Sequence, residues 1–382
     1  MSPTSQPIIL IVDDHPEIAD GIAEALQQHG RTVIVAYDPV AAELALRHYP
    51  VTHMLSDIHF SERLDFAGVQ LLDIVRKLRP EARVVVMSGI SAEAVRSAAA
   101  SRGVNAVIEK PSSLVEIEAA LMLPRSTGQA TGTPIRLPPI DELVEGSLLL
   151  PLFQPIVHLG SGRVLGFEAL IRAAAPAPLA TPDGLFEYAT RMGRIVELNA
   201  ACVAVSLREA APLLPRGRIF LNVDAPALGR IHFRALLREN RVDPSRVVIE
   251  LSEAFAVADE VQAIAAIREL RACGMSVAFD DAGDAHSHFP LLAQVRPEFM
   301  KASNRVGALL GTANGDALVT GLLAFAKELG STFILEGLET PEAAARARTL
   351  GIEMAQGYWF GRPVAAAVHA GPPQRTAFMA TA

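Results

Sequence analysis

The sequence predicts an α/β protein in which a doubly wound parallel sheet is followed by a (β/α)8 barrel with one antiparallel strand. Short apolar runs alternate with helical patterns along most of the 382 residues, and this alternation is typical of parallel strands covered by helices. About five such runs lie in the first domain and about eight in the second, and the second number fits a closed barrel. A chain of this length is expected to form two domains.

The boundaries between these parts follow from composition. Residues 125–139 are rich in Gly, Pro, Ser and Thr, which indicates a linker between a first domain at 1–124 and a second domain at 140–370. Residues 371–382 are assigned to a C-terminal tail. The first two apolar runs of the second domain flank a Gly-Ser-Gly turn at 160–162, so one barrel strand is expected to run antiparallel to its neighbours.

Composition excludes several classes of protein. A formal net charge of −8 gives no basic surface for duplex nucleic acid. The N-terminal segment has neither the basic region nor the apolar core of a signal peptide, and no apolar run is long enough for membrane insertion. Cys202 and Cys273 lie far apart, which favours two buried thiols and a reducing, cytoplasmic location over a disulfide framework.

In the first domain, predicted strands end in polar residues that can serve one site. The C-terminal ends of parallel strands form the ligand-binding edge of such a sheet. Carboxylates there can hold a hard cation and accept a phosphoryl group, whose oxygens a lysine and a serine can stabilise. A single strand-end aspartate is more often a cap or turn residue, but the ordered set indicates a site. Its members are Asp13, Asp14, Asp57, Ser88 and Lys110.

The first 124 residues resemble the receiver domain of bacterial two-component response regulators. The resemblance rests on the acidic pair at 13–14, then Asp57, Ser88 and Lys110 before a proline. It implies that Asp57 is the phosphoacceptor, that it binds a cation together with the acidic pair, and that a cognate histidine kinase is a partner. The sequence departs from the family in a longer, proline-free segment after Asp57. Val107 also stands where the family has Tyr or Phe, so the relay of phosphorylation to the output face is expected to be altered.

Polar residues close the apolar runs of the second domain in the same way. In a barrel of parallel strands the C-termini share one rim, where active sites lie. Anionic oxygens select Mg²⁺ or Mn²⁺ over softer metals, and paired divalent ions can activate water against a phosphodiester. The alternative that each acid caps a neighbouring helix explains single members better than the set. The set is Glu168, Asn222, Glu250, Asp280, Asp281, Lys301 and Glu336.

This second domain resembles the EAL domain of cyclic-di-GMP phosphodiesterases. Glu-Ala-Leu at 168–170, Asp-Asp-Ala-Gly at 280–283 and Gln-Gly-Tyr-Trp-Phe-Gly-Arg-Pro at 356–363 carry the resemblance. It implies metal-dependent hydrolysis of cyclic-di-GMP to the linear dinucleotide pGpG. The implied metal ligands are Glu168, Asn222, Glu250, Asp280 and Asp281. The implied catalytic residues are Glu168, Asp281, Lys301, Glu336 and the loop-anchoring Glu253. The implied substrate-binding or supporting residues are Gln154, Arg172, Gln356 and Glu339.

One loop departs from this family. Residues 282–288 read Ala-Gly-Asp-Ala-His-Ser-His where the family has Phe-Gly-Thr-Gly-Tyr-Ser-Ser, and Ser303 replaces an aspartate. The exchange of a phenylalanine for Ala282 is expected to remove packing beneath the loop. Changes around retained ligands commonly cost roughly 10- to 100-fold in affinity or activity. An active but slowed enzyme is therefore expected.

Three functions are compatible with these patterns. The first is a cyclic-di-GMP phosphodiesterase regulated by phosphorylation of the receiver domain. The second is a catalytically weak or inactive cyclic-di-GMP receptor that signals through protein contacts, which the altered loop favours. The third is a protein-interaction output without a nucleotide, against which the retained Gln154 and Arg172 argue. A homo-oligomer, most simply a dimer, is expected.

Overall fold

The computed structural model describes residues 6–28, 31–58, 67–89, 102–123, 132–251, 260–283 and 289–370. They form two compact units. The first combines Met1–Leu148 with Ala173–Arg194, and the second combines Leu149–Arg172 with Ile195–Ala382. The segment from Ala173 to Arg194 therefore folds with the N-terminal part of the chain, although it interrupts the second unit in sequence.

A six-stranded parallel sheet forms the centre of the first unit. Its order is β5-β4-β3-β1-β2-β6, and every pairing between its strands is parallel. The doubly wound sheet predicted from the sequence is confirmed. Its strands are β1 (Ile8–Val12), β2 (Thr32–Ala36), β3 (His53–Asp57), β4 (Arg83–Ser88), β5 (Ala106–Glu109) and β6 (Ile135–Arg136).

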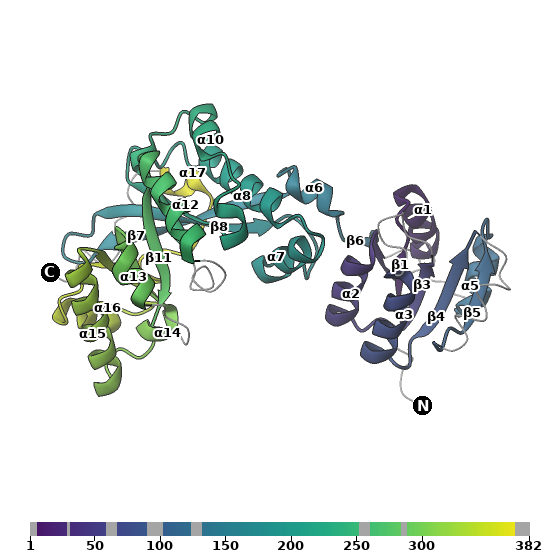
Figure 1. Ribbon diagram of the computed structural model, residues 1–382. Coiled ribbons are helices and arrows are strands. Elements are labelled where there is room, and N and C mark those ends of the chain that lie inside the picture. The colour runs from purple at the N-terminus through teal and green to yellow at the C-terminus, as the bar shows by residue number, and fades with distance from the viewer. Residues whose placement is uncertain are drawn as a thin grey trace. The chain divides into compact units, whose positions relative to one another are not determined.

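Helices flank this sheet, with α1 against α5 and α2 against α3 (Figure 1). The apolar core beneath α1 and α5 combines side chains of alternate strand positions, such as Ile9 and Ile11, with Leu26 and Ile117 of the helices. Asp38 caps the start of α2 through the N–H groups of Val40 and Ala41. The helices of this unit are α1 (Pro16–Gln27), α2 (Pro39–His48), α3 (Ala67–Leu78), α5 (Leu114–Ala120), α6 (Ile140–Val144) and α7 (Pro182–Arg191).

The predicted linker contributes a strand of its own. β6 pairs in parallel with β2 at the edge of the sheet. Arg136 donates hydrogen bonds to Asp20 at 2.6 Å and to Glu24 at 2.9 Å, which fastens this strand to α1. The composition of residues 125–139 predicts a linker, but the Ile-Arg-Leu triplet within it is enough for a short edge strand.

Eight strands close the barrel of the second unit in the order β10-β11-β12-β13-β14-β7-β8-β9. The pairing of β7 with β14 is antiparallel, whereas β8 to β14 are joined by parallel pairings. The barrel and its one antiparallel strand are therefore confirmed. The strands are β7 (Leu149–His158), β8 (Val164–Ala173), β9 (Arg218–Asn222), β10 (Val247–Leu251), β11 (Ser276–Ala282), β12 (Phe299–Ala302), β13 (Thr332–Leu335) and β14 (Met354–Gln356).

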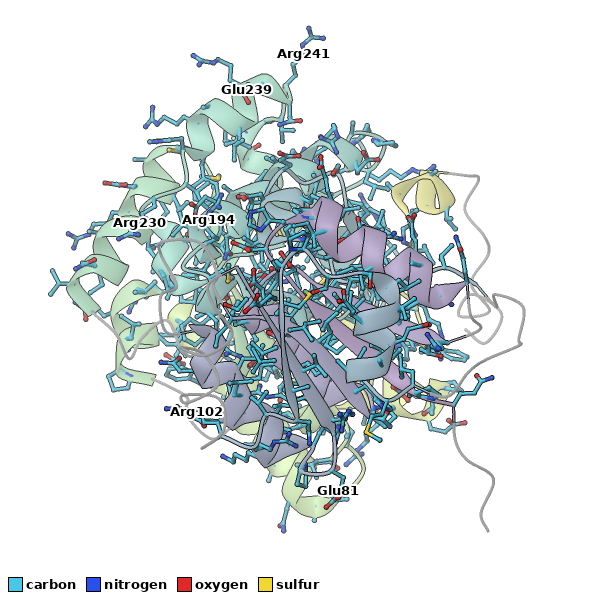
Figure 2. The ribbon with its side chains drawn as sticks, turned by 90° about the vertical axis from the view of Figure 1, so that its right-hand side faces the viewer. Glu81, Arg102, Arg194, Arg230, Glu239 and Arg241 are labelled. Atoms are coloured by element: carbon cyan, nitrogen blue, oxygen red, sulfur yellow. The ribbon has the colours of Figure 1, made fainter. Side chains whose placement is uncertain are left out.

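Amphipathic helices cover the barrel. In α10, Phe233 and Leu237 are buried, whereas Glu239 and the following Arg241 project outward (Figure 2). The helices are α8 (Ile195–Glu209), α9 (Ala225–Leu228), α10 (Phe233–Glu239), the 3-10 helix η1 (Pro244–Arg246), α12 (Glu260–Ala272), α13 (Phe289–Val295), α14 (Asn304–Gly307), α15 (Ala313–Leu329), α16 (Pro341–Thr349) and α17 (Ala366–Ala370).

Among the described residues, no helix has the length and apolar character needed to cross a membrane. The two cysteines differ in burial. Cys202 is buried in α8, but Cys273 is only half-buried. The prediction of a buried thiol is wrong for Cys273, because it lies beyond the end of α12, where Arg234 contacts it at 3.1 Å without covering it fully.

Candidate active site

The predicted rim residues lie at or near the C-terminal ends of the barrel strands. Parallel strands that share one barrel bring these ends together, although the residues are far apart in sequence. The rim residues are Glu168 in β8, Asn222 in β9, Glu250 in β10, Asp280 and Asp281 in β11, Lys301 in β12, Glu336 after β13 and Gln356 in β14.

The ammonium group of Lys301 lies among these carboxylates. Its Nζ is 2.7 Å from Glu336 Oε1, 2.8 Å from Glu250 Oε1, and 3.3 Å from both Glu168 Oε2 and Asp280 Oδ1. The Lys301 side chain is fully buried. Four carboxylates against one ammonium leave three negative charges uncompensated if all four are ionised. Buried charge of this kind is strongly unfavourable, so the site requires bound protons or further cations.

The buried groups respond differently to this environment. Burial raises the pKa of Glu336 to about 8. Burial, with the nearby charge of Glu168, raises the pKa of Glu250 well above its usual value. Burial also opposes ionisation of Glu168, but the charge of Lys301 and two side-chain amides outweigh it and lower the pKa of this carboxyl. Burial alone would lower the pKa of Lys301, but the carboxylates raise it well above its usual value, so this side chain stays charged.

Two groups of carboxylates have the spacing of divalent-cation sites. Ligand oxygens of Glu168, Glu250 and Asp280 lie within 4.8 Å of one another, and so do those of Asp280, Asp281 and Glu336. Oε2 of Glu250 is buried and has no hydrogen-bond partner among the described residues. All-oxygen ligand sets suit Mg²⁺ and Mn²⁺. The residues present therefore fit hard cations that would balance the excess negative charge.

A network of amides holds the carboxylate of Glu168. Asn222 Nδ2 donates to Oε1 at 3.1 Å, and Gln356 Nε2 donates to Oε2 at 2.6 Å. Gln356 Nε2 also donates to Gln154 Oε1 at 3.0 Å, and the Gln154 amide donates to the backbone oxygen of Gly361 at 3.1 Å. Such partners orient a ligating carboxylate before a metal binds. In the structure, the three predicted amide residues thus meet around Glu168.

A cleft of about 700 Å³ opens above the carboxylates, a size within the range of small-molecule sites. Glu250 and Lys301 do not line this cleft and lie beneath its floor, with 1% and 0% of their surface exposed. The predicted residues that line it are Gln154, Glu168, Arg172, Asp280, Asp281, Glu336, Glu339 and Gln356.

The cleft also contains residues that sequence reasoning did not single out. Tyr358 is half exposed, and the guanidinium of Arg362 lies 4.2 Å from its ring centroid. Tyr358 belongs to the motif at 356–363, so the sequence could have indicated it as a site residue. Nothing in the sequence marks Asn304, which also lines the cleft. Gly307 permits the close packing that presents Glu336, because a Cβ there would lie 1.9 Å from the Glu336 backbone oxygen.

Apolar side chains surround the first residues of the altered loop. Ala282 is fully buried in an apolar cluster with Val306 and Leu322. A Cβ at Gly283 would lie 2.9 Å from Val306 and 3.0 Å from Leu322, so these side chains close the space beneath β11. The loss of packing beneath the loop stays a prediction. The rest of the loop, 284–288, and the predicted Glu253 lie outside the described residues.

The first unit has an acidic site of its own. Lys110 Nζ lies 2.7 Å from Asp13 Oδ2 and 2.7 Å from Asp57 Oδ2. Burial alone would lower the pKa of Lys110, but hydrogen bonds to the two carboxylates raise it. Ser88 is buried at the end of the neighbouring strand β4. Asp13, Asp14, His15 and Asp57 each offer a ligand atom, and these atoms lie within 4.8 Å of one another. This spacing fits a cation.

Comparison with known proteins agrees with this arrangement. The profile of the EAL domain family matches residues 140–363, and the profile of the response regulator receiver domain matches residues 9–122. The chain is 29% identical over 222 residues to the probable cyclic di-GMP phosphodiesterase PdeN of Escherichia coli K12. It is 26% identical over 239 residues to the bifunctional diguanylate cyclase/cyclic di-GMP phosphodiesterase MucR of Pseudomonas aeruginosa. These alignments cover 56% and 59% of this chain, but only 43% and 35% of the two relatives.

Solved structures share the barrel. The Klebsiella pneumoniae protein BlrP1, in a manganese and cyclic-di-GMP complex, matches with a TM-score of 0.52 and 26% identity over 57% of this chain and 56% of its own. The phosphodiesterase PaMucR, in a cyclic-di-GMP complex, matches with a TM-score of 0.55 over 60% of this chain and 97% of its own; its 24% identity supports likeness of fold alone. Since the EAL profile spans more than half of the chain, the protein belongs to the EAL domain family and carries a response-regulator receiver domain ahead of its EAL domain.

Proposed function

We propose that the EAL domain hydrolyses cyclic-di-GMP to pGpG and that phosphorylation of the receiver domain regulates this activity. The observation that carries the proposal is the buried Lys301 ammonium among four carboxylates beneath an open cleft. This charge distribution suits divalent cations and an anionic substrate that such cations bridge. The likeness to a probable cyclic di-GMP phosphodiesterase and to a bifunctional diguanylate cyclase/cyclic di-GMP phosphodiesterase supports the substrate assignment.

Mg²⁺ or Mn²⁺, bound by the carboxylates, would polarise a phosphodiester and lower the pKa of a water molecule. Glu168 and Glu250 would hold one cation, Asp281 and Glu336 a second, with Asp280 between them. Asn222 is predicted as a ligand. It would also orient the carboxylate of Glu168 through its hydrogen bond.

The remaining residues would position these groups and the substrate. Lys301 would hold the Glu250 and Glu336 carboxylates in place and offset their charge from beneath the floor. Arg172 lines the cleft and would bind phosphate oxygens, for which a guanidinium is well suited. Glu339 lines the same cleft. Roles for Gln154 and Gln356 in substrate binding would add to their role in orienting Glu168. Glu253 as a loop anchor stays a prediction.

In the receiver domain, Asp57 would accept the phosphoryl group from a cognate histidine kinase. Lys110 would neutralise the new phosphoryl oxygens, because it already contacts Asp57 and Asp13. A cation at the carboxylates of Asp13 and Asp14 would share this task. Loss of phosphate incorporation in Asp57→Ala on incubation with acetyl phosphate is the expected result, and incorporation at the wild-type level would contradict the assignment.

A cyclic-di-GMP receptor without turnover is a second candidate, and two observations favour it. Ser303 is buried at the start of α14, where the family has an aspartate. Ala282, next to the paired aspartates, is enclosed by apolar side chains. Neither residue is one of the four carboxylates around Lys301, so the two changes would alter the placement of those carboxylates while leaving their charge for binding.

Turnover of cyclic-di-GMP by the full chain separates the two candidates. With Mg²⁺ or Mn²⁺ we expect pGpG as product, and exhaustive chelation should stop its formation. Glu168→Ala should lower turnover by more than about 100-fold, beyond the usual effect of a residue that only supports a ligand. Glu209→Ala, at an exposed position in α8, is the control and should leave turnover unchanged. Binding without any product in the wild type would establish the receptor instead.

A further inference from the structure

The helix α7 makes a polar contact with α2 inside the first unit. Residues 173–194 lie within the EAL profile in sequence, yet they fold with the receiver sheet. At the contact, Tyr188 is fully buried and donates a short hydrogen bond from its hydroxyl to Asp38 Oδ2. The other carboxylate oxygen of Asp38 accepts from the N–H groups of Val40 and Ala41, each at 2.9 Å. The buried carboxylate of Asp38 therefore caps the N-terminus of α2 and accepts a hydrogen bond from α7.

Charged groups extend this contact along both helices. Glu43 of α2 accepts from Arg191 of α7 at 2.6 Å, and from Arg47 of its own helix. Arg47 reaches across to Glu187 of α7 at 2.7 Å. Tyr49, directly after α2, donates to the backbone oxygen of Ala177 at 2.6 Å. Asp38 and Glu43 are both buried and both hydrogen-bonded to α7 at this contact.

Both ends of this contact continue into functional residues. On the receiver side, the N–H of Asp13 donates to the oxygen of Ala36 at 3.3 Å, two residues before Asp38. On the other side, the chain before α7 is β8, which carries Glu168 and Arg172 and ends at Ala173. Covalent continuity thus joins the α2–α7 contact to the strand that supplies two residues of the cleft.

We propose that the α2–α7 contact is the surface through which the state of the phosphoacceptor site is transmitted to β8. The proposal rests on the proposed function for the identity of the regulated activity. Phosphorylation of Asp57 would change what Lys110 binds and so the position of Asp13, to which the end of β2 is hydrogen-bonded. The start of α2 follows at Asp38, and Tyr188 transfers any shift there to α7. The hydroxyl of Tyr188 is the group whose removal would break this coupling.

The test measures hydrogen exchange in the full chain, with and without beryllium fluoride and Mg²⁺ as a mimic of the aspartyl phosphate. We expect exchange at 182–191 to change by at least about twofold in the wild type and not at all in Asp57→Ala. Tyr188→Phe keeps the buried ring but removes the hydroxyl. In this variant 53–57 should still respond, while 182–191 should not.

Tyr37→Phe is the matched control, because it also removes a tyrosine hydroxyl bonded to a carboxylate, that of Asp20, but does not involve α7. It should respond as the wild type does. An unchanged 182–191 segment in the wild type, or an equal response in Tyr188→Phe, would overturn the proposal.

Turnover of cyclic-di-GMP in the same samples separates this proposal from the proposed function. The ratio of turnover with and without beryllium fluoride should differ from one in the wild type and be about one in Tyr188→Phe, as expected when coupling is lost. Absence of turnover in every sample, with the expected exchange pattern, would remove the catalytic proposal and leave the contact as the transmitting surface. Turnover that responds equally in wild type and Tyr188→Phe would keep the catalytic proposal and exclude the α2–α7 contact as the transmitting surface.

Discussion

The receiver domain and the barrel each place one lysine among carboxylates at the ends of parallel strands. The two lysines differ in burial and in the number of carboxylates that they contact. Lys110 is 22% exposed at its side chain and contacts two carboxylates. Lys301 is fully buried and contacts four. Burial alone would lower the pKa of both lysines, but the neighbouring carboxylates raise it in each case.

This difference separates a site that can change its state from one that is fixed. At Lys110, whose side chain is 22% exposed, a water molecule or a phosphoryl oxygen can take the place of one carboxylate partner. A buried ammonium among four carboxylates has no such substitute, because each separated charge would remain in a medium of low polarity. We therefore expect Lys110 to exchange partners during signalling and Lys301 to keep the same partners throughout turnover.

The largest expected effect tests this difference directly. In the presence of a chelator, Lys301→Met should lower the free energy of unfolding of the barrel by about 3–5 kcal/mol, because it leaves buried carboxylates unpaired. Lys110→Met should cost less than Lys301→Met, because Lys110 contacts two carboxylates rather than four and its own side chain is 22% exposed. Trp359 is the only tryptophan of the chain, so its fluorescence during urea denaturation reports on the barrel, while hydrogen exchange reports on the receiver. Equal losses in the two variants would contradict the comparison.

Cation binding should stabilise the barrel by the next largest amount. Mn²⁺ at about 100 times its dissociation constant should add about 2.7 kcal/mol to the free energy of unfolding followed by Trp359. Glu168→Ala should remove most of this gain, whereas Asp57→Ala should leave it intact, because Asp57 belongs to the receiver site. A gain that survives Glu168→Ala would mean that Mn²⁺ binds elsewhere.

Restoring a family aromatic should change the stability of the two domains by different amounts. Ala282→Phe should destabilise the barrel by about 1–3 kcal/mol, because Ala282 is fully buried in a closed apolar cluster. Val107→Phe should change the stability of the receiver by less than about 1 kcal/mol, since Val107 is only half-buried. Thermal unfolding of both variants, compared with the wild type, measures these changes in stability. A stabilised Ala282→Phe variant would restore the view that this position lacks packing.

The smallest expected effect concerns pH. Burial raises the pKa of Asp38 above its usual 3.8, despite the hydrogen bond from Tyr188. The folded state therefore binds a proton more tightly than the unfolded state. The contribution of Asp38 to stability is fully present below about pH 3.8 and is lost as the pH rises through its folded pKa. Asp38→Asn should flatten this part of the stability profile.

Asp316 in the barrel provides the opposite case. Hydrogen bonds from Arg346 and from the N–H of Gly311 lower the pKa of its carboxyl. Its contribution is present above about pH 3.8 and is lost as the pH falls through the folded pKa. Asp316→Asn should therefore reduce the loss of stability in acid, as measured by urea denaturation across pH. The same direction of change in Asp38→Asn and Asp316→Asn would contradict these assignments.

Local patterns in the sequence predicted much of the fold and of the candidate site. The run before Glu250 is a buried strand, and the same reasoning found the strands that carry Glu168 and Lys301. The proline and glycine around residues 135–136 predict a linker there, because a strand of two residues has almost no periodicity to detect. Asn304 was missed for a similar reason, since one polar residue at the start of a short helix carries no pattern.

The sequence by itself determined that the acidic residues meet at the barrel rim, because apolar runs fix where each strand ends and parallel strands share one rim. Only the tertiary structure decided how these residues are used. Gln356 donates to Gln154, 202 positions away, and thereby orients Glu168. Tyr188 donates to Asp38 across 150 positions and attaches α7 to α2. Such contacts depend on which surfaces pack together. The packing of these surfaces is determined by the whole folded chain rather than by any local segment.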